Sequence, residues 1–238
     1  MRIKLSVVVG LSAALVGVAA CASQPPVTTA QQGLVADGLL LGEPCAPPCW
    51  QGLVPGASTL EDIDYVLSTS PYVARGSVYR DSYGDILSVL WRPRWQSPAD
   101  NRFVVRGKLL QDIQMYVEPD VTIGQVVDRW GPPEKFQAGR SMHPEPVYIA
   151  VDLFYRGLGM MVELELSADD PELTREEEIV RVHYFQPAPL DEVLAGLVWG
   201  KGAVLGDDQV KALQHWLEGW EDWKGYGHVE LTYQFGAE

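Results

Sequence analysis

The chain has few of the residue types that form most catalytic and metal sites. It contains three cysteines and four histidines in 238 residues. The histidines are His143, His183, His215 and His228, and no two of them have the spacing of a metal-binding motif. We interpret His183, which lies in a predicted strand, as a surface or packed residue. A Gly-x-Ser-x-Gly elbow, a glycine-rich phosphate loop and a His-Glu-x-x-His motif are also missing from the sequence. We therefore expect no catalytic residue, no metal and no cofactor, and predict that the protein is not an enzyme.

Basic residues are scarce as well. There are 18 lysines and arginines against 32 aspartates and glutamates, which gives a formal net charge of −14. Nucleic-acid binding needs a basic face that displaces counterions, so we exclude nucleic acid as a partner. The same balance argues against a polybasic contact with anionic lipid. Hydrophobic residues make up 47% of the chain and include eight tryptophans, which is enough for a substantial core.

No apolar segment of the sequence reaches the roughly 20 residues that a membrane-spanning helix needs. The most apolar segment, residues 5–18, follows Arg2 and Lys4 and leads into VAAC at positions 18–21. A basic start, a short apolar centre and a small-residue cleavage site are typical of a secretory signal. We therefore predict that residues 1–20 are a signal peptide and that the mature protein is exported.

The tetrapeptide VAAC, which ends at Cys21, resembles the lipobox of bacterial lipoproteins. In that family the cysteine sulfur receives a diacylglycerol, the peptide is cut before the cysteine, and the new amino terminus is often acylated. The resemblance implies that Cys21 is the lipid attachment site. It also implies an anchor on the outer face of the plasma membrane or on an outer membrane, since two or three acyl chains hold a protein far longer than one. The alternative is an ordinary cleaved signal followed by an accidental cysteine.

The two other cysteines, Cys45 and Cys49, lie close together in the segment CAPPCW. Because an exported chain meets an oxidising environment, we predict a disulfide between them. So short a loop contributes only about 2 kcal/mol, so its role would be to fix the entry of the chain onto Trp50. Free thiols are the main alternative. A redox motif would more often have two intervening residues, and a zinc site would need two further ligands nearby.

The segment between the predicted signal and Trp50 is rich in Gln, Pro, Thr, Ala and Gly. Such a composition is typical of a linker, and we predict that residues 21–48 form a flexible tether. We expect the apolar residues 38–41 within it to dock as an edge strand. Regular order should begin near Trp50.

One pattern occurs twice, in residues 53–67 and again in residues 117–133. In each copy a hydroxyl residue, Thr59 or Thr122, precedes apolar residues at positions i, i+3 and i+7, which predicts a capped helix. Glycine and two prolines end the second helix at residues 131–133.

Segments with strand character follow each predicted helix, at matching offsets in the two copies. They are residues 86–91, 109–117, 149–154, 159–166 and 179–185. We predict an α+β fold of two tandem repeats, each a helix plus an antiparallel meander, with helices packed on one face of each sheet. The repeats would span residues 49–118 and residues 119–187.

The opening PGASTLEDI at residue 55, and its partner that ends in WGPP at residues 130–133, resemble the start of BamE/SmpA-like lipoprotein domains. Tandem copies of that unit are also similar to the β-lactamase inhibitor protein. The resemblance implies helices packed on an antiparallel sheet, and a role in binding other proteins without catalysis.

Residues 188–238 should form a C-terminal helical segment and a final strand over residues 228–235. In the helix predicted for residues 207–221 and its continuation, Trp216, Trp220 and Trp223 follow the spacing i, i+4, i+7 and would share one face. Tryptophan is enriched at interaction hot spots, so this face is the candidate binding surface. The interpretation that we favour is that it packs against the body of the protein.

Two functions of different class are consistent with these features. The first, which we favour, is a membrane-anchored lipoprotein of the cell envelope that binds another envelope protein and has no catalytic activity. The alternative is an envelope hydrolase or carbohydrate-binding protein with an acidic cleft that bears tryptophan. Two carboxylates about 5–10 Å apart beside an exposed tryptophan would favour the alternative.

Overall fold

The computed structural model describes residues 34–94, 100–140, 147–199 and 204–232. The predicted signal peptide, Cys21, the first part of the predicted tether and the end of the predicted final strand lie outside these ranges. In the described ranges, no helix is both long enough and apolar enough to cross a membrane.

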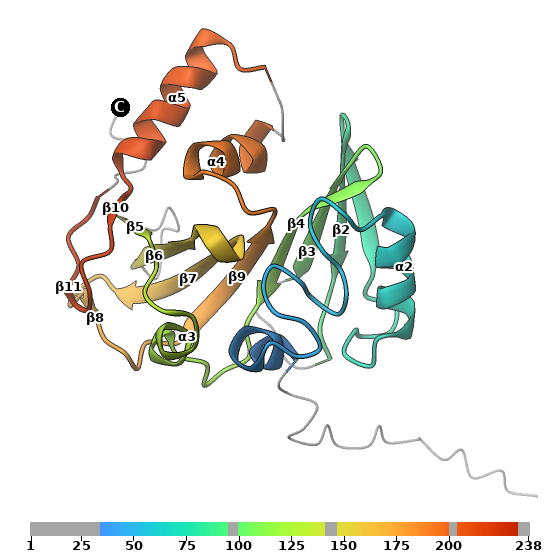
Figure 1. The fold of residues 1–238 in the computed structure, drawn as a ribbon, viewed down its shortest axis with the longest axis horizontal. Helices are drawn as coiled ribbons and strands as arrows, with labels where there is room; N and C mark the ends of the chain where they lie inside the picture. Colours follow the sequence, from blue (N-terminus) through green and yellow to red (C-terminus); the bar gives the residue numbers. More distant parts are fainter. Residues whose placement is uncertain (1–33, 95–99, 141–146, 200–203, 233–238) are drawn as a thin grey trace, which may run out of the picture.

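The fold is α+β and is dominated by one nine-stranded antiparallel sheet with the strand order β1-β2-β3-β4-β9-β7-β6-β5-β10 (Figure 1). Its strands are β1 (Tyr79–Tyr83), β2 (Ile86–Trp91), β3 (Asn101–Arg106), β4 (Leu109–Tyr116), β5 (Lys135–Arg140), β6 (Tyr148–Tyr155), β7 (Met160–Ser167), β9 (Ile179–Phe185) and β10 (Glu221–Asp222). A separate pair consists of β8 (Glu172–Leu173) and β11 (Gly227–His228). The helical elements are α1 (Leu34–Ala36), η2 (Asp37–Leu41), α2 (Leu60–Thr69), α3 (Ile123–Trp130), η3 (Arg156–Leu158), α4 (Leu190–Trp199) and α5 (Asp207–Glu218).

Helices α2 and α3 begin at the two threonines that the sequence predicts as caps. The Thr59 hydroxyl accepts from the Asp62 N–H, and the Asp62 carboxylate accepts from the Thr59 N–H at 2.7 Å. Thr122 and Gln125 form the same reciprocal pair. Each reciprocal pair is a capping box, and it satisfies two backbone N–H groups that have no partner within the helix. These local predictions are confirmed.

The strands predicted between residues 86 and 185 also occur, but they belong to one sheet instead of two. The prediction of a final strand that starts at residue 228 is wrong for residues 229–232, because only Gly227–His228 pairs as a strand, with β8. Strand β4 pairs with β9, where Ile113 lies opposite Tyr184. The pairing removes two edges that would otherwise expose unpaired backbone groups. It also extends one apolar face across the whole sheet, because Ile113, Met115, Val182 and Tyr184 are all buried on that face. We call this apolar side the first face of the sheet.

Helices α2 and α3 and the segment of residues 34–53 cover the first face. An aromatic cluster fills the core beneath them: the ring of Trp50 stacks on Trp91 with centroids 5.1 Å apart, and Phe103 lies 5.6 and 5.9 Å from the two rings. Trp91 and Phe103 are fully buried. The tryptophans thus connect the entry of the chain to strands β2 and β3.

Residues 34–41 are helical and pack against this core through Val35 and Leu39, so the prediction of a flexible tether is wrong for that stretch. Residues 37–41 are helical and not an edge strand, and Val35 and Leu39 are buried. The Glu118 carboxylate accepts hydrogen bonds from the backbone N–H groups of Val35 and Ala36 at 2.9 and 3.0 Å. A carboxylate at the start of a helical segment accepts from backbone N–H groups that have no partner within the helix, and its negative charge is favourable there. The two bonds to Glu118 therefore fix the position of this segment.

Helix α4 lies on the opposite side, the second face of the sheet. Phe154, Met161 and Phe185 alternate with residues of the first face and pack with Val193 and Leu194 of α4. Helices therefore cover both faces, whereas the sequence analysis places them on one face. The reason is that these three side chains form an apolar surface on the second face, which α4 removes from water.

Candidate functional site

A band of charged and polar side chains crosses the second face where β4 meets β9. Cross-strand pairing places Arg102 opposite Gln114, and Gln114 opposite His183. A parallel row runs from Tyr116 to Arg181 and Glu163. We call the following eight residues the polar band: Arg102, Asp112, Gln114, Tyr116, Asp152, Glu163, Arg181 and His183.

The members of the polar band contact one another. Arg181 forms an ion pair with Glu163 at 3.2 Å and donates to the Tyr116 hydroxyl at 3.0 Å. The Gln114 amide donates to the Asp112 carboxylate. Arg102 donates through two nitrogens to the neutral Ser88 hydroxyl at 2.9 and 3.1 Å. The contacts hold the band in a fixed arrangement on rigid strands.

Several buried polar atoms of the band have no hydrogen-bond partner among the described residues. They are Oδ1 of Asp112, Nε of Arg181 and both ring nitrogens of His183. An unsatisfied buried group costs about 1–3 kcal/mol. Their concentration in one band marks it as the candidate functional site, because a bound partner or water would satisfy them.

The pKa values follow from burial in this band. Burial raises the pKa of Asp112 to about 7, against the opposing effects of the Gln114 hydrogen bond and the Arg102 charge. Burial, and then repulsion by Glu163, raises the pKa of Asp152 to about 7. Burial lowers the pKa of His183 to about 3, and the charges of Arg181 and Arg102 add to that effect. At neutral pH His183 is therefore uncharged, and two carboxyl groups are only partly ionised beside two arginines.

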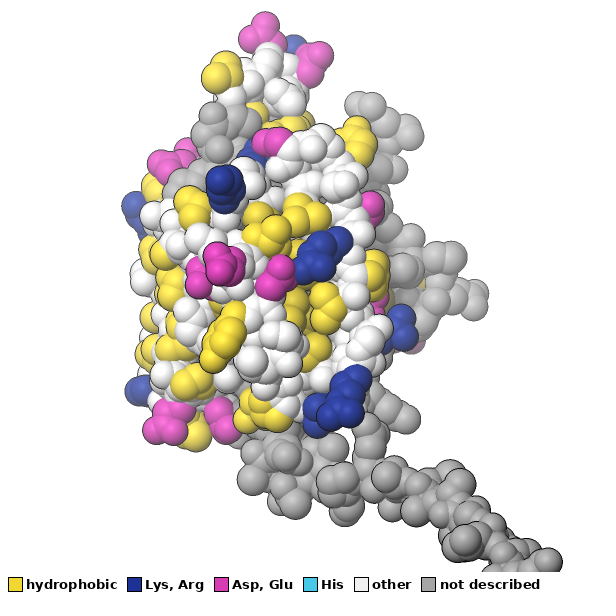
Figure 2. All heavy atoms as spheres, turned by 90° about the vertical axis from the view of Figure 1, so that its right-hand side faces the viewer, with side chains coloured by type: hydrophobic (Ala, Val, Ile, Leu, Met, Phe, Trp, Pro, Cys, Tyr) yellow, Lys and Arg dark blue, Asp and Glu magenta, His cyan; other side chains and the backbone are white. Residues whose placement is uncertain are grey.

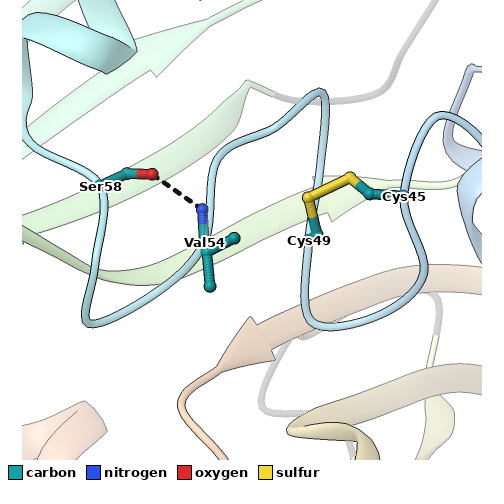
Figure 3. Close-up of a disulfide and its surroundings, with 4 residues drawn as sticks. All are labelled: Cys45, Cys49, Val54 and Ser58. Carbon is teal, nitrogen blue, oxygen red and sulfur yellow. Dashed lines mark hydrogen bonds between the residues drawn. A yellow bond between two sulfur atoms is a disulfide. The ribbon is translucent and has the colours of Figure 1, made fainter.

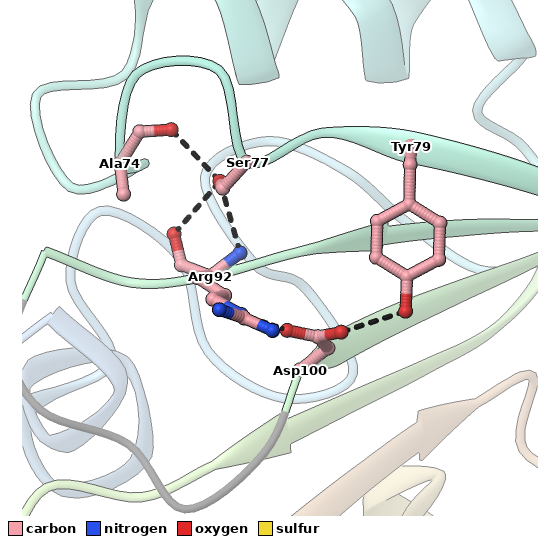
Figure 4. Close-up of polar contacts among 5 residues, drawn as sticks. All are labelled: Ala74, Ser77, Tyr79, Arg92 and Asp100. Carbon is pink, nitrogen blue, oxygen red and sulfur yellow. Dashed lines mark hydrogen bonds and ion pairs between the residues drawn. The ribbon is translucent and has the colours of Figure 1, made fainter.

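A cavity of about 160 Å³ opens between the two arginines, and we call it the arginine pocket. Arg102, Gln114, Tyr116, Arg181, Leu90 and Asp100 line it. The Asp100 carboxylate at its edge accepts from Arg92 at 2.6 Å and from the Tyr79 hydroxyl at 2.7 Å (Figure 4). Ser77 supports Arg92, since its hydroxyl accepts from the Arg92 backbone N–H at 3.1 Å. Arg92 pairs with Asp100 and Arg181 pairs with Glu163, whereas Arg102 donates to a neutral hydroxyl, so the charge of Arg102 gives the pocket a positive potential inside an acidic protein.

Exposed tyrosines continue this surface toward the edge of the sheet. Tyr79 and Tyr83 of β1 lie opposite Leu90 and Ile86 of β2, and all five residues of β1 are exposed. On the side of the molecule that carries α2 and β1, hydrophobic side chains gather between charged ones (Figure 2). The ion pair between Arg80 of β1 and Asp64 of α2 lies at this edge.

The structure joins Cys45 and Cys49 in a disulfide, with their Cα atoms 5.6 Å apart (Figure 3). The Cys49 N–H donates to the Ala46 carbonyl at 3.0 Å, so the loop is a tight turn. Trp50 follows directly and is buried. The bond therefore lies where the chain enters the aromatic cluster, as the sequence analysis expects.

The disulfide leads to a chemical prediction. Alkylation of the unfolded protein without reductant should leave Cys45 and Cys49 unmodified in the mass spectrum, and prior reduction should add two alkyl groups. Reduction should also lower the free energy of unfolding by about 2 kcal/mol, because the loop that it opens is short. Two alkylated thiols without reductant would contradict the bond.

The three C-terminal tryptophans do not share a helical face, so that prediction is wrong. Helix α5 ends at Glu218 and Gly219, before Trp220. Trp216 stacks on Trp199 of α4 with centroids 5.9 Å apart. Trp220 is buried with its ring edge-on to Phe154 at 6.2 Å. Trp223 follows β10 and is half-buried, with its ring in edge contacts with Phe136 and Tyr226 at 6.2 and 5.7 Å.

A second cavity, of about 350 Å³, lies beside Trp223 and bears on the carbohydrate alternative. Glu221 and Glu230 line it together with Lys224. Lys224 forms an ion pair with Glu221, and the Trp223 ring packs against the rings of Phe136 and Tyr226. The cavity thus lacks the exposed tryptophan beside two free carboxylates that the alternative needs.

The sequence analysis missed every member of the polar band except His183, which it interprets as a surface or packed residue. The band residues come from β3, β4, β6, β7 and β9, and most of them lie between apolar neighbours of their own strand. One signal was available: Asp112 and Asp152 are lone acidic residues in strands that are otherwise largely buried. A charge at such a position needs a partner or a function.

Comparison with models of known protein families, with curated proteins and with solved structures gives no match for this chain. Among the described residues, no group of three or more His, Cys, Asp or Glu side chains is placed to hold a metal ion.

Proposed function

We propose that the chain is an exported, lipid-anchored protein of the cell envelope that binds another protein, without catalysis, through the polar band. The anchor is Cys21, on the pattern of residues 1–21. The segment of residues 34–53, which packs on the first face, then connects the anchor to the folded body.

The arrangement of strands supports two diverged repeats. In each half one capped helix precedes the strands, and the sheet order is β1-β2-β3-β4 in the first half and β9-β7-β6-β5 in the second. The last strands of the two halves, β4 and β9, are therefore neighbours. We infer that the two halves are tandem repeats joined at this junction, and that the polar band lies across it.

One observation carries the proposed binding role: the buried polar atoms without partners are grouped with half-buried arginines and a tyrosine on a broad sheet face. Arginine and tyrosine are enriched at the energetic centres of protein interfaces. The band extends over five strands, which is wider than a small ligand needs and fits a protein surface. The arginine pocket should receive an acidic side chain of the partner, because a guanidinium pairs with a carboxylate through two hydrogen bonds.

Photocrosslinking in the native cell tests this proposal. A photoreactive residue at Leu90, which lines the arginine pocket, should give one adduct of discrete mass with a membrane-associated protein. The same residue at Val210, which is exposed on α5, should give none.

The substitution Arg102→Gln should then reduce the Leu90 adduct about tenfold or more, since a hot-spot arginine contributes about 2 kcal/mol or more. Lys211→Gln on the exposed side of α5 is the matched control and should leave the adduct unchanged. An adduct that survives Arg102→Gln, or the lack of any adduct at Leu90, would contradict the proposal.

A further inference from the structure

A small pocket lies between α4 and the second face of the sheet, beside the polar band. Its volume is about 70 Å³. The walls are largely apolar, with one carboxyl group inside and another on the helix side, and the main lining residues are Val104, Phe185, Val193, Leu197, Asp112 and Glu192. The established contacts of α4 with Phe185 fix the position of the helix over the pocket.

Asp112 is the one deeply buried acidic group of this pocket among the described residues, with a side chain only 2% exposed. Its Oδ2 accepts from the Gln114 amide, and its Oδ1 has no partner in the described part of the chain. The register shifts between Val104 and Val105, which puts a bulge in β4 at this point. A bulge re-aims side chains locally, and here Gln111 is the extra residue, next to Asp112 at the pocket.

The charges around the pocket favour a cation over an anion. Glu192 of α4 is exposed and adds a second carboxylate. His183 on β9 is uncharged at neutral pH, because burial holds its pKa at about 3. The guanidinium of Arg102 on β3 acts on Asp112 through its charge, but its nitrogens donate to the Ser88 hydroxyl, so Oδ1 of Asp112 has no hydrogen-bond partner among the described residues. A cation at Oδ1 would remove the cost of an unpaired buried oxygen.

We propose that this pocket binds a primary alkylammonium group, with the alkyl chain between α4 and Phe185 and the ammonium on Asp112. A volume of about 70 Å³ is about half that of a cavity that holds benzene, so it fits the end of a short chain and excludes a ring. The source of the group is either a free alkylamine or a lysine side chain of a partner protein. The inference does not depend on the lipid anchor or on the partner of the arginine pocket.

Titration calorimetry with the full chain in detergent tests the proposal. The probes are n-butylamine and n-butanol, which share shape but not charge. We expect n-butylamine to bind at least tenfold more tightly than n-butanol. Binding should strengthen from pH 6 to pH 8, as the Asp112 carboxyl loses its proton while the amine stays charged.

Variants locate the site. Asp112→Asn keeps the shape and should weaken n-butylamine binding at least tenfold, whereas Asp191→Asn removes an exposed carboxylate of α4 outside the pocket lining and should change it less than threefold. Gly196→Leu should block the pocket from α4 while leaving Asp112 in place. Equal binding of the two probes, equal losses in the two carboxylate variants, or binding that survives Gly196→Leu would overturn the proposal.

A third probe, Nα-acetyl-lysine-N-methylamide, distinguishes the two sources. If it binds as tightly as n-butylamine, the pocket accepts a lysine side chain of a protein. If n-butylamine alone binds, the natural ligand is a free amine. If neither binds, water satisfies Asp112 and the inference is wrong.

Discussion

Replacing Trp220 with alanine should lower the free energy of unfolding by about 3–5 kcal/mol, a large share of the 5–15 kcal/mol of an ordinary domain. Trp220 is 8% exposed, and its ring contacts Phe154 in the cluster that holds α4 on the second face. Its indole Nε1 has no hydrogen-bond partner among the described residues. The loss therefore comes from packing, because the substitution leaves a cavity without breaking a polar contact.

Trp216→Ala is the matched control. Trp216 is half-buried and stacks only on the neighbouring helix, through Trp199. Its removal should cost about 1 kcal/mol, the scale of an aromatic pair with limited burial. Urea denaturation of both variants, followed by far-ultraviolet circular dichroism, gives the comparison. Equal losses would mean that the cluster around Trp220 does not support the fold as the structure indicates.

The sequence contains the information for those features that depend on a few neighbouring residues. Each capping box needs a threonine and a polar residue three positions later, and both are visible in the printed chain. Strands β2 and β9 coincide with the predicted ranges because they are rich in β-branched and aromatic residues. Gly131, at a φ of 84°, ends α3 where a left-handed conformation excludes most other residues.

Features that depend on distant residues could not be predicted in this way. Residues 34–41 follow a segment rich in Gln, Pro and Thr, and their placement depends on Glu118, far along the chain. The helical spacing of the tryptophans is interrupted at Gly219, and the pairing of Trp223 with Phe136 then gives that ring a different partner. The polar band requires the register of β4 against β9, which no local pattern indicates.

The second large effect concerns location: Cys21→Ser should release the protein from membranes or leave it uncleaved. Two or three acyl chains contribute about 0.8 kcal/mol for each buried CH₂, so their loss removes most of the binding energy of the proposed anchor. The acidic chain, with its net charge of −14, would not compensate through anionic lipid.

Membrane fractionation and the intact mass measure this outcome together. The wild-type chain should sediment with membranes and carry the mass of the acyl groups on a chain that begins at Cys21, and the Cys21→Ser chain should lack that mass. The double variant with Cys45→Ser and Cys49→Ser is the control: it loses the disulfide but should stay with the membrane, because the attachment requires only the cysteine that follows the small residues at positions 18–20. Unchanged mass and unchanged membrane retention in Cys21→Ser would exclude the lipid anchor, and would leave the proposed binding surface to be explained in a protein that is held at the membrane by other means.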